Sequence, residues 1–341
     1  MGVNLTPIMV KRILTLDQLR GRSLAVDASN YLYQFLALIR TKNGTPLKDS
    51  HGNVTSHLAG LMFRSTRLIC GFNIDLIFVF DGKPPSLKQE TIRKRREQRK
   101  QAVDDWQKAL QKEDYAKAFS KAIMTSRLSR SMIDDAKKLL TFLGIPFVEA
   151  PSEAEAQIAF MARRGDVWAA NSKDYDTLLF GTPRLLRFLT ISGQEHLPSK
   201  GTSRPIEPEL ITSTELLGHH QITREQLVDL AILVGTDFNK GVKGVGPKTA
   251  LKLIQKHGKI EKLPIAILSK IPSQYQEVRE IFLNPPTTSD YSLTYGPFQE
   301  KKLFSFLCDD RGFSQERVET IAHRMKEFNR FRQSRLEKWL V

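Results

Sequence analysis

Acidic side chains follow several short apolar runs of this 341-residue chain. Asp27, Asp81 and the pair Asp174 and Asp176 each come within a few residues of such a run. Short apolar, β-branched runs predict strands, and ligands of parallel α/β sheets bind beyond the carboxyl ends of those strands. The sequence therefore predicts carboxylates at the carboxyl ends of several strands.

Three more acids have comparable positions. Glu153 and Glu155 stand at the start of a predicted helix, and Asp237 lies in a loop that begins with Gly235. If all seven carboxylates converge, their repulsion must be neutralised, and Mg²⁺ prefers such oxygen ligands together with phosphate oxygens and water. Two such ions about 4 Å apart can activate water and stabilise the leaving oxygen of a phosphodiester. Spacing along the chain does not by itself establish the convergence.

Structural explanations of the same acids remain open from the sequence. Ser152 and Glu155 have the spacing of a capping box, with Ser152 as the N-cap of the helix. Asp174 or Asp176 would be a favourable N-cap for a helix that begins near Thr177. Neither explanation accounts for Glu153.

The elements that would position these residues are short strands alternating with helical patterns. This alternation predicts an α/β fold with a mostly parallel central sheet flanked by helices, in a single domain over 1–330. The predicted strands are 23–26, 74–80, 145–148, 167–170 and 185–189. Residues 197–208, rich in Pro, Ser, Gly and Thr, are predicted to form a loop or an excursion at the sheet edge.

A basic segment follows Asp81. Residues 83–138 contain 16 Lys or Arg and 8 Asp or Glu, and few Gly or Pro follow the prolines at its start. We expect a basic helical insertion over 83–130, which could be a solvated charged face or a funnel that guides a single strand. Tyr33, downstream of Asp27, could stack a base beside it.

A glycine-rich turn lies at 241–250, inside a predicted helix-hairpin-helix region at 223–262. Glycines allow a phosphate to approach the backbone amides at the next helix N-terminus, and such contacts hold a duplex without reading its sequence. The residues concerned are Lys243, Gly244, Gly246 and Lys248. An ordinary glycine-rich connection is the alternative.

Composition narrows the class of protein. Lys and Arg number 52 against 37 Asp and Glu, a formal net charge of +15, so a polyanionic partner is expected. Only Cys70 and Cys308 occur, which argues against a disulfide framework or a thiolate zinc site and fits a reducing compartment. No apolar run approaches the roughly 18 residues of a membrane span, so we expect an intracellular protein with no membrane partner.

Five motifs together resemble the flap endonucleases, of the archaeal type, over essentially the whole chain. They are Val-Asp-Ala-Ser-Asn at 26–30, Phe-Val-Phe-Asp-Gly-Lys-Pro-Pro at 78–85, Ala-Pro-Ser-Glu-Ala-Glu-Ala at 150–156, Asp-Tyr-Asp at 174–176 and Gly-Thr-Asp at 235–237. The resemblance implies a structure-specific nuclease that hydrolyses phosphodiester bonds at the base of 5′ flaps in DNA replication and repair, with 5′-3′ exonuclease activity expected as well.

The resemblance also implies roles for individual residues. The seven acids would bind two Mg²⁺ ions, for which Mn²⁺ could substitute, and Lys88 and Arg95 would assist at the scissile phosphate. Tyr33 would stack beside that phosphate, and Gly2 would lie near the active site. The insertion at 83–130 would be an arch around the 5′ single strand. The glycine-rich turn would grip duplex DNA, with K⁺ bound there.

The C-terminal segment resembles the family's sliding-clamp motif. Leu336 and Trp339 are three residues apart and would share one face of a helical turn, although a frayed terminus is the alternative. The residues implied in clamp binding within the tail 331–341 are Gln333, Leu336, Trp339 and Leu340. A monomer in the archaeal cytoplasm, acting at the replication fork, is the corresponding expectation.

Two rival functions remain. A related 5′-exonuclease or bubble-cutting repair nuclease would share the same core, but the compact insertion and the clamp-like tail favour the flap enzyme. A junction-binding scaffold would need only the basic surfaces, so the presence of all seven acids argues against it.

Overall fold

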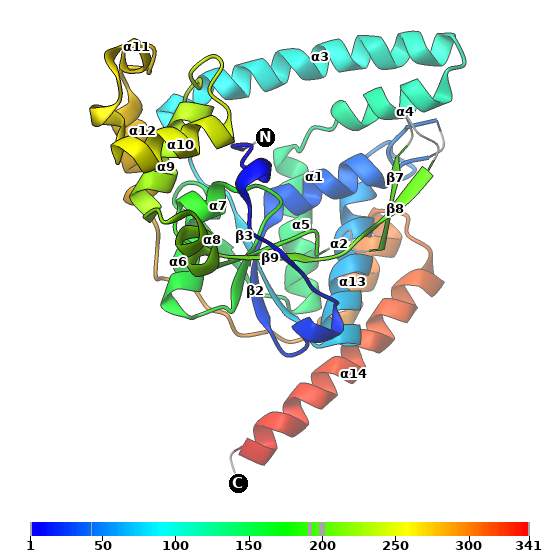
Figure 1. Ribbon diagram of the computed structural model, residues 1–341. Coiled ribbons are helices and arrows are strands. Elements are labelled where there is room, and N and C mark those ends of the chain that lie inside the picture. Colours follow the sequence, from blue (N-terminus) through cyan, green and yellow to red (C-terminus); the bar gives the residue numbers. More distant parts are fainter. Residues whose placement is uncertain (1, 42, 190–192, 198–201, 340–341) are drawn as a thin grey trace.

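The central element is a seven-stranded sheet in a computed structural model that describes residues 2–41, 43–189, 193–197 and 202–339 (Figure 1). The strand order is β1-β9-β6-β5-β2-β3-β4, with parallel pairing from β6 through β4 and antiparallel pairing of β9 and β1. The strands are β1 Arg12–Ile13, β2 Ser23–Asp27, β3 Asp75–Phe80, β4 Phe147–Glu149, β5 Ala169–Asn171, β6 Arg184–Arg187 and β9 Glu209–Thr212. The predicted mostly parallel sheet is confirmed, and β9 and β1 extend it at one edge.

Helices cover both faces of the sheet because alternate residues of its inner strands point to opposite sides. Leu24 and Val26 of β2 join a core with α1, α2, α5, α13 and α14. Ala25 joins a smaller core with α6 on the other face. The helices named here are α1 Ala28–Leu38, α2 Ser56–Thr66, α5 Arg130–Leu143, α6 Ala154–Arg164, α13 Glu300–Phe304 and α14 Gln315–Trp339.

A further core joins the N-terminal segment to the helices of the middle of the chain. Val3, Leu5 and Ile8 are buried in it, so the first residues are held against the body of the protein. Phe282 packs against Phe180 and Phe238, with ring centroids 5.0 and 5.3 Å apart. The helices here are α7 Asp176–Leu179, α8 Ser213–His220, α9 Arg224–Val234, α10 Pro247–His257, α11 Ile265–Leu268 and α12 Tyr275–Leu283.

The predicted basic insertion is helical and forms a hairpin of α3 Gln89–Gln111 and α4 Tyr115–Met124. Small buried residues line the contact between the two helices, including Ala109 of α3 and Ala118 of α4. Asp114 is the N-cap of α4, and its side chain accepts a hydrogen bond from the Lys117 backbone amide at 3.0 Å. Figure 1 shows this hairpin lying across one end of the sheet, above the N-terminus, whereas α14 leaves the opposite end.

The segment at 197–208, predicted as a loop or an excursion at the sheet edge, is not a plain loop. It contributes to a separate two-stranded antiparallel sheet of β7 Gly193–Leu197 and β8 Thr202–Ile206, which lies in the chain between β6 and β9. The helix α14 continues through the predicted tail as far as Trp339. The side chains of Gln333, Leu336 and Trp339 lie outside the described residues, as does all of Leu340. Within the described residues, no helix combines the length and apolar character of a membrane span.

Candidate active site

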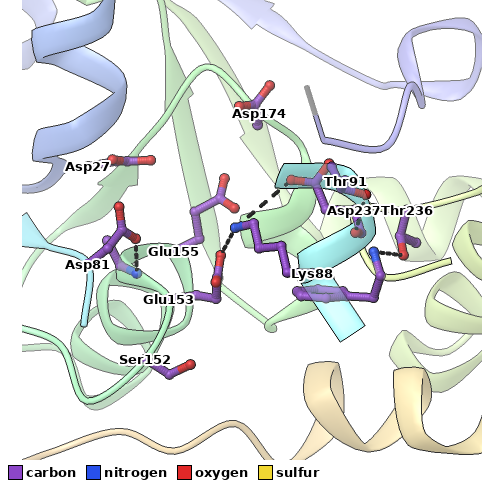
Figure 2. Close-up of polar contacts among 12 residues, drawn as sticks. Asp27, Asp81, Lys88, Thr91, Ser152, Glu153, Glu155, Asp174, Thr236 and Asp237 are labelled. Carbon is purple, nitrogen blue, oxygen red and sulfur yellow. Dashed lines mark hydrogen bonds and ion pairs between the residues drawn. The ribbon is translucent and has the colours of Figure 1, made fainter. Parts of the chain in front are cut away.

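Two acidic side chains lie at the carboxyl ends of adjacent parallel strands. Asp27 is the last residue of β2, and Asp81 follows the last residue of β3. Asp27 is buried and accepts a hydrogen bond from the Asn30 amide at 2.9 Å, which caps α1. Figure 2 shows these carboxylates gathering with those of other elements, with Lys88 between Glu153 and Asp237.

The start of α6 adds two more acids, Glu153 and Glu155. Asp81 accepts a hydrogen bond from the Ala154 amide at 2.8 Å and so satisfies the first turn of this helix. The Ser152 hydroxyl donates to the Lys83 carbonyl at 3.1 Å, and the helix has no side-chain cap from its own N-cap residue. The capping-box explanation is therefore wrong, because Asp81 takes over the amide end of the helix.

Asp174 and Asp176 follow β5 in a turn that leads into α7. The Asp176 carboxylate is buried and accepts a hydrogen bond from the Val3 backbone amide at 2.8 Å. The Asp174 carboxylate accepts one from the side-chain amide of Asn30 at 3.3 Å. Neither side chain caps α7, whose N-cap is Tyr175 without a side-chain hydrogen bond. These carboxylates thus contact distant segments, which excludes a purely local capping role.

Gly2 lies directly against Asp176. A Cβ atom at this position would come within 2.6 Å of both carboxylate oxygens, closer than any ordinary contact. A side chain at this position would force the Asp176 carboxylate to move, so Gly2 lies directly at the site.

The seventh acid, Asp237, is held in a tight loop between α9 and α10. Gly235 has a φ of +104°, and the Thr236 amide donates to the Asn239 carbonyl at 3.1 Å. The Asn239 side chain donates to the Ile232 carbonyl at the end of α9 at 2.8 Å. This closed loop buries Asp237 and directs its carboxylate toward α3.

Burial and mutual repulsion raise the pKa of four of these carboxylates, which are Asp27, Glu153, Glu155 and Asp176. Burial raises the pKa of Asp27 well above its usual value, and Asp81 raises it further. Burial likewise raises the pKa of Glu155, with added repulsion from Asp176. The pKa of Asp176 is raised to about 7 by burial and then by Asp174 and Asp237. The acids therefore face one another in a site of low polarity.

Two cations of the hairpin base enter this acidic cluster. The Lys88 ammonium contacts the Glu153 carboxylate and lies 3.9 Å from Asp237, and the Arg95 guanidinium lies 2.7 Å from both Asp237 oxygens. Burial lowers the pKa of Lys88, but the charge and hydrogen bond of Glu153 together with the charges of Glu155 and Asp237 outweigh it, and the net shift is upward. The Thr91 hydroxyl donates to the Asp237 carbonyl at 2.8 Å, so α3 contacts this loop through Thr91 as well as through Arg95.

The donor set fits hard divalent cations. All seven groups are carboxylates, the ligands that Mg²⁺ prefers, and the raised pKa values of Asp27, Glu153, Glu155 and Asp176 reflect burial and a mutual repulsion that a cation would relieve. In the described part of the chain, no three acidic, imidazole or thiol groups stand at the spacing that would enclose one ion.

Other predicted residues lie around the carboxylates rather than among them. Tyr33 of α1 is 37% exposed, so its ring is available to a ligand. Gly244 has a φ of +85°, and Gly246 precedes the first turn of α10, where no side chain caps the helix. Lys243 and Lys248 are exposed in the same segment. The structure thus presents backbone amides and two ammonium groups at one helix N-terminus.

Three contributors to the site were not predicted. Asn30 bonds both Asp27 and Asp174, Ser172 donates to Glu155 at 3.2 Å, and the Val3 amide orients Asp176. Asn30 belongs to the motif at 26–30, so its polar side chain next to an apolar strand was a usable signal. A backbone amide such as that of Val3 leaves no signal in a sequence.

Comparisons with known proteins agree with this geometry. The XPG N-terminal domain matches residues 1–102, and the XPG I-region matches residues 144–237. Flap endonuclease 1 of Pyrococcus abyssi is 46% identical over 344 residues, covering 100% of this chain and 99% of that protein. Flap endonuclease 1 of Archaeoglobus fulgidus is 44% identical over 340 residues, covering 99% of this chain and 100% of that protein.

Solved structures show the same architecture. Flap endonuclease-1 from Methanococcus jannaschii superposes with a TM-score of 0.77 at 38% identity, covering 96% of this chain and 98% of that one. The catalytic core of Rad2 in complex with a DNA substrate has a TM-score of 0.65 at 24% identity, covering 93% and 95% of the two chains, which is a likeness of fold.

Proposed function

The chain belongs to the flap endonuclease family, and we propose that it hydrolyses one phosphodiester bond at the base of a 5′ flap in branched DNA, at the seven-carboxylate cluster. Homologues across the full length identify it as a structure-specific 5′ nuclease. The observation that carries the site assignment is the set of buried, mutually repelling carboxylates at the carboxyl ends of parallel strands.

The proposed cofactors are two Mg²⁺ ions, with Mn²⁺ able to substitute. Metal dependence is typical of this nuclease family, and the all-oxygen donor set supports the hard ion Mg²⁺. The residues that would hold the ions are Asp27, Asp81, Glu153, Glu155, Asp174, Asp176 and Asp237. When bound, such ions activate the attacking water and stabilise the leaving oxygen.

The chain's own cations would complete the chemistry. Lys88 and Arg95 reach the cluster from the base of α3, and both contact acids that would hold metal. In the substrate complex we assign them to the scissile phosphate, where their fixed charges stabilise the charge that develops during hydrolysis. Their removal should therefore lower the rate of the chemical step more than the affinity for DNA.

The surrounding surfaces would place the substrate. The hairpin of α3 and α4, within the arch proposed at 83–130, would enclose the 5′ single strand, and the exposed ring of Tyr33 would stack on a base near the cut. The proposed helix-hairpin-helix region at 223–262 would hold the duplex through Lys243, Gly244, Gly246 and Lys248, with K⁺ as a candidate ion there. Phosphate contacts of this kind fix position without reading sequence.

The C-terminal segment would attach the enzyme to a sliding clamp. Gln333, Leu336, Trp339 and Leu340 are the proposed anchors, and the spacing of Leu336 and Trp339 supports this assignment. We propose a monomeric enzyme that acts at the replication fork, where strand displacement generates 5′ flaps.

Cleavage of a double-flap DNA labelled at its 5′ end tests the proposal. The wild-type protein should cut at the flap base in Mg²⁺ and not in EDTA, and Asp176→Asn should abolish the cut while DNA binding persists. The exposed Asp309→Asn is a control of equal charge change that should cut normally. Binding without cleavage by the wild type would favour the junction scaffold, and mononucleotide ladders from a blunt duplex would favour the exonuclease.

A further inference from the structure

Arginine side chains and aromatic rings alternate along the amino-terminal edge of the sheet, opposite to the carboxylates. Arg22 precedes β2, Trp168 precedes β5 and Arg184 begins β6, and these strands are neighbours in the order β6-β5-β2. The Trp168 amide donates to the Ser23 carbonyl at 2.8 Å. The guanidinium groups of Arg22 and Arg184 both stack on the Trp168 ring, at 5.1 and 5.7 Å from its centroid.

The same arrangement is repeated next to β3. Phe72 lies just before this strand, and the Gly21 amide donates to the Asn73 carbonyl at 2.9 Å, so the entries to β2 and β3 run side by side. The guanidinium groups of Arg20 and Arg67 stack on the Phe72 ring at 5.5 and 5.9 Å. Arg20, Arg22, Arg67 and Arg184 form what we call the amino-edge arginine row.

The charges of this row are largely uncompensated. Among the described residues, Arg22, Arg67 and Arg184 form no ion pair with a carboxylate, and only Arg20 has one, with Asp17 at 3.0 Å. All four side chains belong to exposed residues. By contrast, each stacked arginine elsewhere in the described chain also pairs with an acid; these are Arg164, Arg187, Arg279, Arg311 and Arg332.

A cavity of about 1000 Å³ extends the row toward α14. Arg20, Arg67 and Phe72 line one side, and Arg324 of α14 contributes a further guanidinium. Asp17 and Glu327 also line it, but Asp17 is already held by Arg20. The cavity therefore keeps an excess of positive charge beside an aromatic ring.

We propose that the amino-edge arginine row is a second nucleic-acid surface, which binds a phosphate backbone away from the catalytic carboxylates. The five residues of β2 separate the two edges by roughly 17 Å. A guanidinium group presents a planar fork of N–H donors that suits phosphate oxygens, and its plane can stack unpaired bases. Arg184 uses one of its N–H groups on the Trp168 carbonyl at 3.2 Å and keeps the others for such contacts. Arg184 and Arg22 stand at the entries of β6 and β2, two strands and so roughly 10 Å apart, and Arg20 and Arg67 lie beside the entry to β3, so the charges follow the edge of the sheet. An acidic protein surface is the competing partner.

Ternary binding tests this proposal independently of cleavage. The protein is first saturated in EDTA with unlabelled double-flap DNA, and binding of labelled single-stranded (dT)20 or of a plain labelled duplex is then measured across a salt series. The wild type should form the ternary complex. Arg22→Gln/Arg67→Gln/Arg184→Gln should weaken it about tenfold or more, and its slope of log K against log salt should fall by about 2 for the single strand, because three phosphate contacts are lost.

Two matched variants distinguish loss of the arginine row from a general loss of positive charge and from damage to the fold. The scattered control Arg12→Gln/Lys138→Gln/Lys326→Gln removes the same charge, and it should bind (dT)20 as the wild type does. Replacing the three row arginines by Lys keeps the charge and should retain most of the binding and of the salt slope.

Four results would overturn the proposal. The first two are the absence of a ternary complex with the wild type and a loss of DNA binding in the scattered control equal to that of the Gln variant. The third is a loss of DNA binding in the Lys variant as large as in the Gln variant. The fourth is binding of polyglutamate that depends on the row as strongly as DNA binding does. Failure of the wild type to cut double flaps in Mg²⁺ would concern the proposed function alone.

Discussion

The metal-free protein should pay a stability penalty at Asp176 as the pH rises from 5 to 8. Burial, followed by repulsion from Asp174 and Asp237, raises the pKa of this carboxyl to about 7 in the folded protein, from a reference value of 3.8. Between these two values the folded state binds more protons than the unfolded state, so the free energy of unfolding falls with rising pH. The difference of about three pKa units corresponds to roughly 4 kcal/mol at pH 8.

Unfolding by urea in EDTA, at pH 5 and at pH 8, measures this penalty. Asp176→Asn cannot ionise, and its amide oxygen can still accept the hydrogen bond from Val3. This variant should therefore be more stable than the wild type at pH 8, and its advantage should shrink by most of that roughly 4 kcal/mol at pH 5. Asp309→Asn should show no such change between the two pH values, because this exposed acid lies outside the cluster.

Addition of Mg²⁺ should reverse the effect, stabilising the wild type more at pH 8 than at pH 5, because ionised carboxylates are the ligands. The reasoning would be refuted if the Asn variant were no more stable than the wild type at pH 8, or if its advantage were equal at both pH values.

Three further predictions follow from the contacts of the site. Gly2→Ala should lower the rate of single-turnover cleavage about tenfold to a hundredfold, because the new Cβ would displace the Asp176 carboxylate from a hydrogen bond worth about 1.5–3 kcal/mol. The control Gly218→Ala, whose Cβ would enter open space, should cut normally. Lys88→Gln should lower kcat by about 10²–10³ with little change in KM, and an equal change in both would argue against a role in the chemical step. Lys243→Gln/Lys248→Gln should weaken duplex binding and reduce its salt slope by about 2, and an unchanged slope would exclude phosphate contacts.

The sheet and its carboxylates could be predicted because both depend on local sequence. An apolar strand that is buried on both faces is a continuous apolar run, and the acid that ends it is visible directly after it, as with Asp27 and Asp81. The edge strand β1 has only two residues, which is too short for a recognisable pattern. The strand β9 directly follows the segment 197–208, whose Pro, Ser, Gly and Thr content favoured a loop. The β7–β8 hairpin is composed of residues that are typical of loops.

Side-chain and backbone partners were harder to predict. The capping box at Ser152 matched its spacing, yet Asp81 from a strand 73 residues away occupies the Ala154 amide. The Thr91 contact with Asp237 and the Val3 contact with Asp176 likewise join distant segments. Such contacts depend on the tertiary fold, and local spacing carries no information about them.

Backbone amides from other parts of the fold orient three carboxylates of the site. In Asp27, Asp81 and Asp176, one oxygen accepts a backbone amide, from Asn30, Ala154 and Val3, while the other accepts no hydrogen bond within the described residues. In each of these side chains, one oxygen therefore holds a backbone amide and the other is available to a metal ion. Replacing any of these three residues by Ala removes the hydrogen bond to the backbone together with the proposed metal ligand. The inactivity of an Ala variant would therefore combine the effects of both changes. Asn keeps an oxygen that can accept the backbone hydrogen bond, so the Asn variant tests the loss of the charged metal ligand alone.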